Sequence, residues 1–194
     1  MRIAVCGTHC CGKSTIIEEF LLTHPDFTHE PEPYRVLEED YGEVFDAEPS
    51  PDDFYRQLEF IAGRLRCYQR GERVIFERSP VDFLAYLLAL TDLGRRGGAG
   101  YVIDRSIAMV REAIQLLDLI VFLPLNDSGS DTGDEDPELR WAVNSRLEDI
   151  FNNDDFNLFT SDRPLTLQAT GSTAQRLRML ERAVELSLAD DKTG

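Results

Sequence analysis

Eight consecutive residues near the N-terminus combine the side chains and the spacing that bind phosphate. They read Gly7-Thr8-His9-Cys10-Cys11-Gly12-Lys13-Ser14 and match the pattern G-x-x-x-x-G-K-[ST]. An apolar run, Ile3–Cys6, precedes them and a helical pattern, Ser14–Leu22, follows them. Glycines allow a turn whose backbone N–H groups surround an anion, and the N-terminus of the next helix adds its dipole. The segment therefore predicts a loop for the phosphates of a nucleoside triphosphate.

The residues of this loop have different expected roles. Lys13 should reach the β- and γ-phosphates, and the Ser14 hydroxyl should bind Mg²⁺. The sequence leaves open whether Cys10 and Cys11 are reactive thiols or side chains that only fill the loop. The residues expected to contact the nucleotide here are Gly7, Thr8, His9, Cys10, Cys11, Gly12, Lys13, Ser14 and Thr15.

A second charged group follows another apolar run, Val74–Phe76, which reads as a buried strand. In a parallel sheet the carboxyl end of this strand should lie beside the phosphate loop, because ligands bind at that edge. Glu77 could then hold Mg²⁺, directly or through water, and Arg78 could contact the phosphates. Asp82, five residues after Glu77, is a further candidate for contact with substrate. The alternative is a salt bridge at the end of a strand.

A third acidic cluster, His29-Glu30-Pro31-Glu32-Pro33, follows a weak strand pattern at Phe27–His29. Its two prolines predict a stiff segment that is not helical. A carboxylate held there could accept the proton of an attacking hydroxyl group. The alternative is a solvated acidic turn.

The clearest helical pattern is Pro51–Arg70, with Gly71 as its expected C-terminal cap. Gln57 and Arg64 are seven residues apart and share a face of this helix. Gln57 could hydrogen-bond a base or an amide, and Arg64 could meet an anion; the alternative is that both are solvated. The apolar stripe expected to face the core consists of Phe54, Leu58, Ile61, Leu65 and Tyr68.

Strand and helix patterns alternate along the whole chain, which favours a parallel sheet covered by helices on both faces. The expected strands are Ile3–Cys6, Phe27–His29, Val74–Phe76, Leu119–Leu123 and Leu165–Leu167. The expected helices are Ser14–Leu22, Pro51–Arg70, Val81–Leu90, Ile103–Leu117, Pro137–Phe151 and Thr173–Leu188. An acidic insert, Asn126–Asp136, and a tail, residues 190–194, are expected to be mobile.

Length and charge restrict the class of protein. The chain has 194 residues and a formal net charge of −16, which fits one domain that is a poor partner for long duplex nucleic acid or an anionic membrane. No apolar run approaches the ~20 residues of a membrane helix. The four cysteines show no paired metal-binding spacing, so reduced thiols in a cytoplasmic protein are expected.

Taken together, these residues resemble the deoxynucleoside kinase and thymidylate kinase branch of P-loop kinases, and also NadR-like ribosylnicotinamide kinase domains. The segments that carry the resemblance are Gly7–Ser14, Glu30–Pro33, the spacing of Gln57 and Arg64, and Glu77–Ser79. The resemblance implies a three-layer α/β P-loop NTPase fold with a parallel sheet of about five strands in the order 2-3-1-4-5. It also implies a single kinase-like domain over residues 1–194, with a lid region over residues 124–151.

The resemblance also implies roles for particular residues. Glu32 or Glu30 would be the base, with Glu32 preferred, and Gln57 would face the nucleobase near Arg64. Arg140 and Arg146 would close over the phosphates, although a spacing of six would not aim both at one point from a continuous helix. Gly171 and Ser172 would lie beside the base of ATP, or would form an ordinary N-cap turn.

These observations favour an ATP- and Mg²⁺-dependent kinase that transfers the γ-phosphoryl group to a hydroxyl. A nucleoside-like acceptor is the first choice, and a nucleotide, or the end or a modified base of a polynucleotide, comes next. The alternative is a regulatory P-loop NTPase that has no transfer acceptor; the absence of the motif Asn-Lys-x-Asp weakens its GTP-binding form. The sequence leaves open the acceptor, the choice of ATP or GTP, and a possible homodimer.

Overall fold

The computed structural model describes residues 1–46, 48–95, 99–125, 136–159 and 164–190. A five-stranded sheet in the order β2-β3-β1-β4-β5 forms its centre, and each neighbouring pair of strands is parallel. This confirms the three-layer fold and the strand order expected from the sequence. The strands are β1 (Arg2–Cys6), β2 (Thr28–Glu30), β3 (Val74–Glu77), β4 (Leu119–Phe122) and β5 (Leu165–Gln168).

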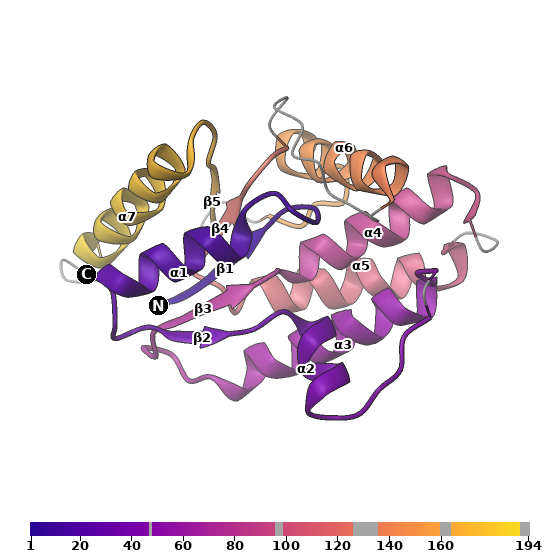
Figure 1. The fold of residues 1–194 in the computed structure, drawn as a ribbon, viewed down its shortest axis with the longest axis horizontal. Coiled ribbons are helices and arrows are strands. Elements are labelled where there is room, and N and C mark those ends of the chain that lie inside the picture. Colours follow the sequence, from indigo (N-terminus) through magenta and orange to yellow (C-terminus); the bar gives the residue numbers. More distant parts are fainter. Residues whose placement is uncertain (47, 96–98, 126–135, 160–163, 191–194) are drawn as a thin grey trace.

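Helices cover both faces of the sheet (Figure 1). Ile3 and Val5 of β1 belong to the core under α1 and α7, whereas Ala4 and Cys6 belong to the larger core under α3, α4, α5 and α6. This alternation explains why β1 reads as a continuous apolar run, since both of its faces are buried. The helices are α1 (Lys13–Thr23), α2 (Pro33–Glu39), α3 (Pro51–Cys67), α4 (Pro80–Asp92), α5 (Gly100–Ile114), α6 (Pro137–Asn153) and α7 (Thr173–Asp190).

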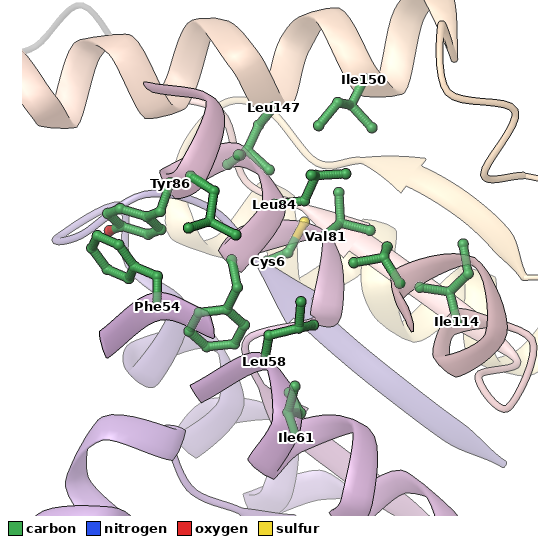
Figure 2. Packing of buried hydrophobic residues seen from close by; sticks show 14 of the residues in the cluster. Cys6, Phe54, Leu58, Ile61, Val81, Leu84, Tyr86, Ile114, Leu147 and Ile150 are labelled. Atoms are coloured by element: carbon green, nitrogen blue, oxygen red, sulfur yellow. The ribbon is translucent and has the colours of Figure 1, made fainter. Parts of the chain in front are cut away.

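Helix α4 is the centre of the larger core. Every residue from Pro80 to Leu90 is buried, and Leu84 lies among side chains of neighbouring elements (Figure 2). The helix begins with a capping box in which Ser79 and Asp82 satisfy each other's backbone N–H groups. Because β3 leads directly into this cap, the end of the strand is fixed in the middle of the domain.

Some elements differ from the sequence-based prediction. Pro33 does not exclude a helix but begins α2, since the first helical position needs no N–H donor. Helix α3 ends at Cys67, and Gly71 lies in the following turn with φ of 101° rather than capping the helix. Leu165 of β5 is 50% exposed, because β5 is an edge strand.

The acidic insert and the C-terminal tail are the two segments that the sequence predicts to be mobile. Asp190, expected in a mobile tail, is the last residue of α7. Residues 191–194 and residues 126–135 of the acidic insert lie outside the described residues. In the part of the chain that the structure describes, no helix combines the length and the apolar character needed to cross a membrane.

Candidate functional site

The phosphate loop connects the carboxyl end of β1 to the N-terminus of α1, at the point where the sheet continues to β3 on one side and β4 on the other. Gly7 has φ of 149°, and a Cβ there would lie 2.5 Å from Cys11 Sγ and 2.7 Å from Leu123 O. Gly12 has φ of 96° and precedes the first turn of α1. Both positions therefore need glycine, as the sequence pattern implies.

Lys13 is buried within the loop that precedes it. Its Nζ donates to the Thr8 carbonyl oxygen at 2.9 Å, so the side chain folds back across the loop. Thr8 is itself buried, and its hydroxyl donates to the Arg140 carbonyl oxygen at 3.2 Å. The lysine charge is thereby held at the centre of the loop.

Two oxygen atoms that could bind a metal ion, from two different elements, lie beside this loop. The Ser14 hydroxyl at the start of α1 donates to Glu77 Oε1 at 2.6 Å, at the end of β3. His29 Nε2 of β2 makes no hydrogen bond within the described residues and lies 3.8 Å from Glu77 Oε2. Hydroxyl and carboxylate oxygens suit Mg²⁺, which binds through one or two protein groups plus substrate phosphates. Within the described residues, no cluster of three or more His, Cys, Asp or Glu residues that could hold a metal occurs.

Asp82 holds the start of the phosphate loop through a hydrogen bond to its backbone. Its carboxylate accepts hydrogen bonds from the N–H of Gly7 at 2.9 Å and from the N–H and hydroxyl of Ser79 at 2.7 and 2.9 Å. Burial raises the pKa of Asp82, and the charge of Arg78 opposes that effect. Asp82 does not line the cavity described below, so the structure gives it the position of a support for the loop rather than that of a substrate contact.

Arg78 is the central cation of the site. It has φ of 82°, in the left-handed region that side chains other than glycine rarely adopt. Its guanidinium is buried, donates to Glu32 Oε1 at 2.5 Å and to Gly7 O at 3.1 Å, and lies 5.2 Å from the centre of the Tyr86 ring. Such strain persists only where the surroundings fix it, and it concentrates at functional sites.

The Glu32 carboxylate is ionised by these neighbours. Burial opposes its ionisation, but the charges of Arg78 and Lys13 outweigh burial and lower the pKa of Glu32 to about 2. Glu32 is the N-cap residue of α2, so the turn after β2 carries it toward the phosphate loop.

A cavity of about 250 Å³ opens beside the phosphate loop. Its lining combines Thr8, His9, Glu32 and Arg78 with several aromatic side chains. The rings of Phe54 and Tyr86 stack with centroids 4.4 Å apart. The buried Gln57 side chain is the amide of this lining. The remaining lining residues are Tyr34, Pro49, Phe83, Asp136, Leu139 and Arg140.

Two residues proposed for substrate binding lie elsewhere. Arg64 Nε donates to Glu30 at 3.0 Å, its other nitrogen bonds the same carboxylate, and the Tyr68 hydroxyl completes the cluster. Neither Glu30 nor Arg64 lines the cavity. Seven residues of helix extend over about 10 Å, so a shared face does not bring Arg64 to the place that Gln57 occupies.

The structure also separates the two arginines of the segment expected to form a lid, residues 124–151. Arg140 Nε donates to the His9 carbonyl oxygen at 3.0 Å and a terminal nitrogen donates to that of Cys10 at 3.3 Å, so Arg140 lies over the phosphate loop. Arg146 instead pairs with Asp92 of α4, with Nε 2.5 Å from the carboxylate. Both arginines lie on the continuous helix α6, which keeps a spacing of six from converging.

The turn before α7 has the geometry of an N-cap. The Ser172 N–H donates to Gln175 Oε1 at 2.8 Å, and the Gln175 N–H donates to Ser172 Oγ at 3.4 Å. Gly171 has φ of 91°, which allows the turn. Contact of Gly171 and Ser172 with the base of a nucleotide stays a prediction.

Sequence reasoning missed several residues that the fold brings to the site. Tyr86, Phe83 and Tyr34 line the cavity, and Arg176 of α7 donates to the Cys11 carbonyl oxygen in the phosphate loop. Tyr86 and Phe83 look like core positions in the sequence, and Arg176 looks like one of several charges on a helix. No signal in the sequence distinguishes them, because their partners are distant along the chain.

The parallel sheet and the Gly7–Ser14 loop define a P-loop NTPase fold, which several solved structures share. Deoxyadenosine kinase from M. mycoides with bound dATP has a TM-score of 0.66 and 16% identity, covering 95% of this chain and 99% of that chain. Thymidylate kinase from Candida albicans has a TM-score of 0.65 and 15% identity, covering 95% and 91%. NadR in complex with NAD and AMP-PNP has a TM-score of 0.61 and 13% identity, covering 93% of this chain and 48% of that chain. At these identities the likeness concerns the fold.

The family is shown by the sequence itself. A family model described as an AAA domain matches residues 2–162, which is well over half of the chain, so the chain belongs to this AAA domain family. No curated protein matches the chain by sequence.

Proposed function

We propose that the protein is an ATP- and Mg²⁺-dependent kinase that transfers the γ-phosphoryl group to a hydroxyl of a nucleoside-like acceptor. The observation that carries the proposal is the cavity beside the phosphate loop, in which the Glu32 carboxylate lies with Thr8 and His9. A P-loop that only bound or hydrolysed a nucleotide would need no aromatic cavity there. The solved structures that share the fold include nucleoside and nucleotide kinases, which supports the same reading.

Each residue has a role that follows from its position. The loop amides and Lys13 hold the β- and γ-phosphates, and Arg78 and Arg140 lie where charge develops during transfer. Glu32 accepts a hydrogen bond from the acceptor hydroxyl and takes its proton as the bond to phosphorus forms. Because the charges of Arg78 and Lys13 lower its pKa to about 2, Glu32 is ionised at neutral pH and can accept the proton.

Ser14 and Glu77 are the residues that would hold Mg²⁺, and the ion would neutralise charge on the β- and γ-phosphate oxygens. The hydrogen bond between them shows that both oxygens reach one point at the mouth of the loop. The aromatic walls exclude water from the acceptor, which limits competing hydrolysis.

Charge favours a nucleoside over a nucleotide as acceptor. Among the described residues that line the cavity, the arginines are Arg78 and Arg140, and both are assigned above to the phosphoryl group in transfer. A substrate phosphate would therefore meet Glu32 and Asp136 without a cation left for it among the lining arginines. The net charge of −16 also disfavours a polynucleotide acceptor.

The test is a panel of nucleosides, nucleotides and oligonucleotides with γ-labelled ATP, in which label on the acceptor and label released as phosphate are scored separately. We expect transfer to at least one nucleoside and little transfer to nucleoside monophosphates. Phosphate release without transfer to any acceptor would contradict the proposal and favour a regulatory NTPase.

A further inference from the structure

Arg176 is a buried cation that the mechanism above does not use. It lies in the first turns of α7, is 4% exposed, and is 165 residues from its partner in the phosphate loop. One terminal nitrogen donates to the Cys11 carbonyl oxygen at 2.8 Å, and the other donates to the Pro124 carbonyl oxygen at 2.8 Å. A single guanidinium thus joins α7, the phosphate loop and the segment after β4.

This position is unfavourable for a cation in two respects. Burial disfavours the charged form and lowers the pKa of Arg176. The N-terminal end of a helix carries a partial positive charge, which also disfavours a cation there. A residue kept at such a place against both effects is a candidate for a functional role rather than for stability alone.

The Cys11 carbonyl is the informative partner. In a trans peptide the C=O and the following N–H point in opposite directions, so the bond to Arg176 also fixes the direction of the Gly12 N–H. Gly12 has φ of 96° and, as a glycine, would otherwise have wide conformational freedom. Because Arg176 holds the Cys11 carbonyl toward α7, the Gly12 N–H points away from α7.

The second partner, Pro124, lies in the segment that leads from β4 to α6. Pro124 follows the end of β4, where Leu123 N–H still bonds Cys6 O at 2.9 Å. The next residue, Leu125, donates its N–H to Asn144 Oδ1 of α6 at 2.9 Å. Arg176 and Asn144 thus hold successive residues, and the phosphate loop is tied to the chain that leads to α6.

We infer that Arg176 is a positioning residue of the donor site, which orients the phosphate loop through the Cys11 carbonyl and so sets the affinity for the triphosphate. The inference rests on the proposed function, because it takes the loop to be the binding site for the phosphates of ATP. Arg176 would act on the binding of the phosphates and not on the binding of the acceptor, because it does not line the cavity.

The test compares Arg176→Met and Arg176→Lys with the control Arg178→Met, whose side chain is exposed on the same helix. Dissociation constants for Mg·ATP and for Mg·tripolyphosphate are measured by calorimetry at a temperature where circular dichroism shows each variant folded. We expect Arg176→Met to weaken both ligands by the same factor, about 10- to 100-fold, since hydrogen bonds from a charged group are lost. Arg176→Lys, which keeps a charge and can reach one carbonyl, should be intermediate, and Arg178→Met should match the wild type.

Unchanged tripolyphosphate binding in folded Arg176→Met or Arg176→Lys would overturn the inference, even if ATP binding fell. A rise in the KM for the acceptor with unchanged ATP binding would overturn it too. Failure of the wild type itself to bind ATP would instead contradict the proposed function, so the two ideas fail in different ways.

Discussion

Two arginine–glutamate pairs lie on either side of the turn that joins β2 to α2. Glu30 is the last residue of β2 and pairs with the partly exposed Arg64, outside the cavity. Glu32 caps α2 and pairs with the buried Arg78, inside the cavity and beside the phosphate loop. The two acids are two residues apart and chemically alike, so their position relative to the end of β3 decides which could act on a substrate.

The two pairs also differ in how rigidly they are held. Arg78 has a left-handed backbone, a ring of Tyr86 beside its guanidinium, and hydrogen bonds to Gly7 as well as to Glu32. Arg64 extends from the side of α3 and is 38% exposed. Strained, fully contacted residues are concentrated at functional sites, whereas a half-exposed pair is typical of a structural link. The following predictions test this difference.

The largest expected difference is in transfer by Glu32→Gln and Glu30→Gln. Loss of general-base assistance should slow transfer by Glu32→Gln by about 10²–10⁴-fold while ATP binding is kept. Glu30→Gln should stay close to the wild type. Single-turnover transfer with saturating ATP measures both, and a greater loss in Glu30→Gln would reassign the base.

The second comparison is the stability of Arg78→Met and Arg64→Met. Removing Arg78 leaves Glu32 and Asp82 without their cation in a buried site and should lower the free energy of unfolding by about 3–5 kcal/mol. Removing the half-exposed Arg64 should lower it by about 1 kcal/mol or less. Urea denaturation gives both values, and equal losses would mean that the two pairs are equivalent.

The Glu32–Arg78 pair should also make stability depend on pH. The folded pKa of Glu32 is lowered from 4.5 to about 2, so its contribution is present above pH 4.5 and is lost as the pH falls toward 2. Glu32→Gln should therefore be less stable than the wild type at pH 7, and the gap should narrow between about pH 5 and 2. Denaturant unfolding at several pH values measures the gap; a gap that stays constant would contradict the pairing.

A smaller effect is expected from Gln57, the buried amide of the cavity wall. Gln57→Leu keeps the size of the side chain and removes its hydrogen-bonding groups. We expect the KM for the acceptor to rise about 10-fold with kcat nearly unchanged. Gln69→Leu, at an exposed position, is the control. A fall in kcat without a change in KM would instead mean that Gln57 stabilises the transition state and not the bound acceptor.

The smallest effect should be that of Arg146. Its pair with Asp92 is partly exposed, and such pairs contribute about 0–1 kcal/mol to the free energy of unfolding. Arg146→Met should thus leave transfer nearly unchanged, whereas Arg140→Met, which removes a cation over the phosphate loop, should slow it clearly. Steady-state transfer rates of the two variants test this difference. Equal losses of transfer rate would show that both arginines reach the phosphates, as the family resemblance implies.

Much of the fold and of the arrangement of the Gly7–Ser14 loop could be predicted because the signals are local. The loop pattern, its strand and its helix lie within one short segment, and the parallel sheet then brings Glu77 to Ser14. The prolines around Glu32 predict a segment that is not helical, but Pro33 begins α2, because proline is excluded from helix interiors and favoured at helix starts. Arg176 and Tyr86 were missed because each meets its partner only through the tertiary fold.

The most direct measurement of the central claim is the rate of ADP formation from Mg·ATP with and without an acceptor. A kinase whose cavity positions the acceptor hydroxyl should form ADP at least about 10²-fold faster when a suitable nucleoside is present, because proximity and the base act only on that hydroxyl. Glu32→Gln should remove this stimulation and leave the slow background rate. An ADP rate that no nucleoside changes would contradict the account and show that the cavity is not an acceptor site.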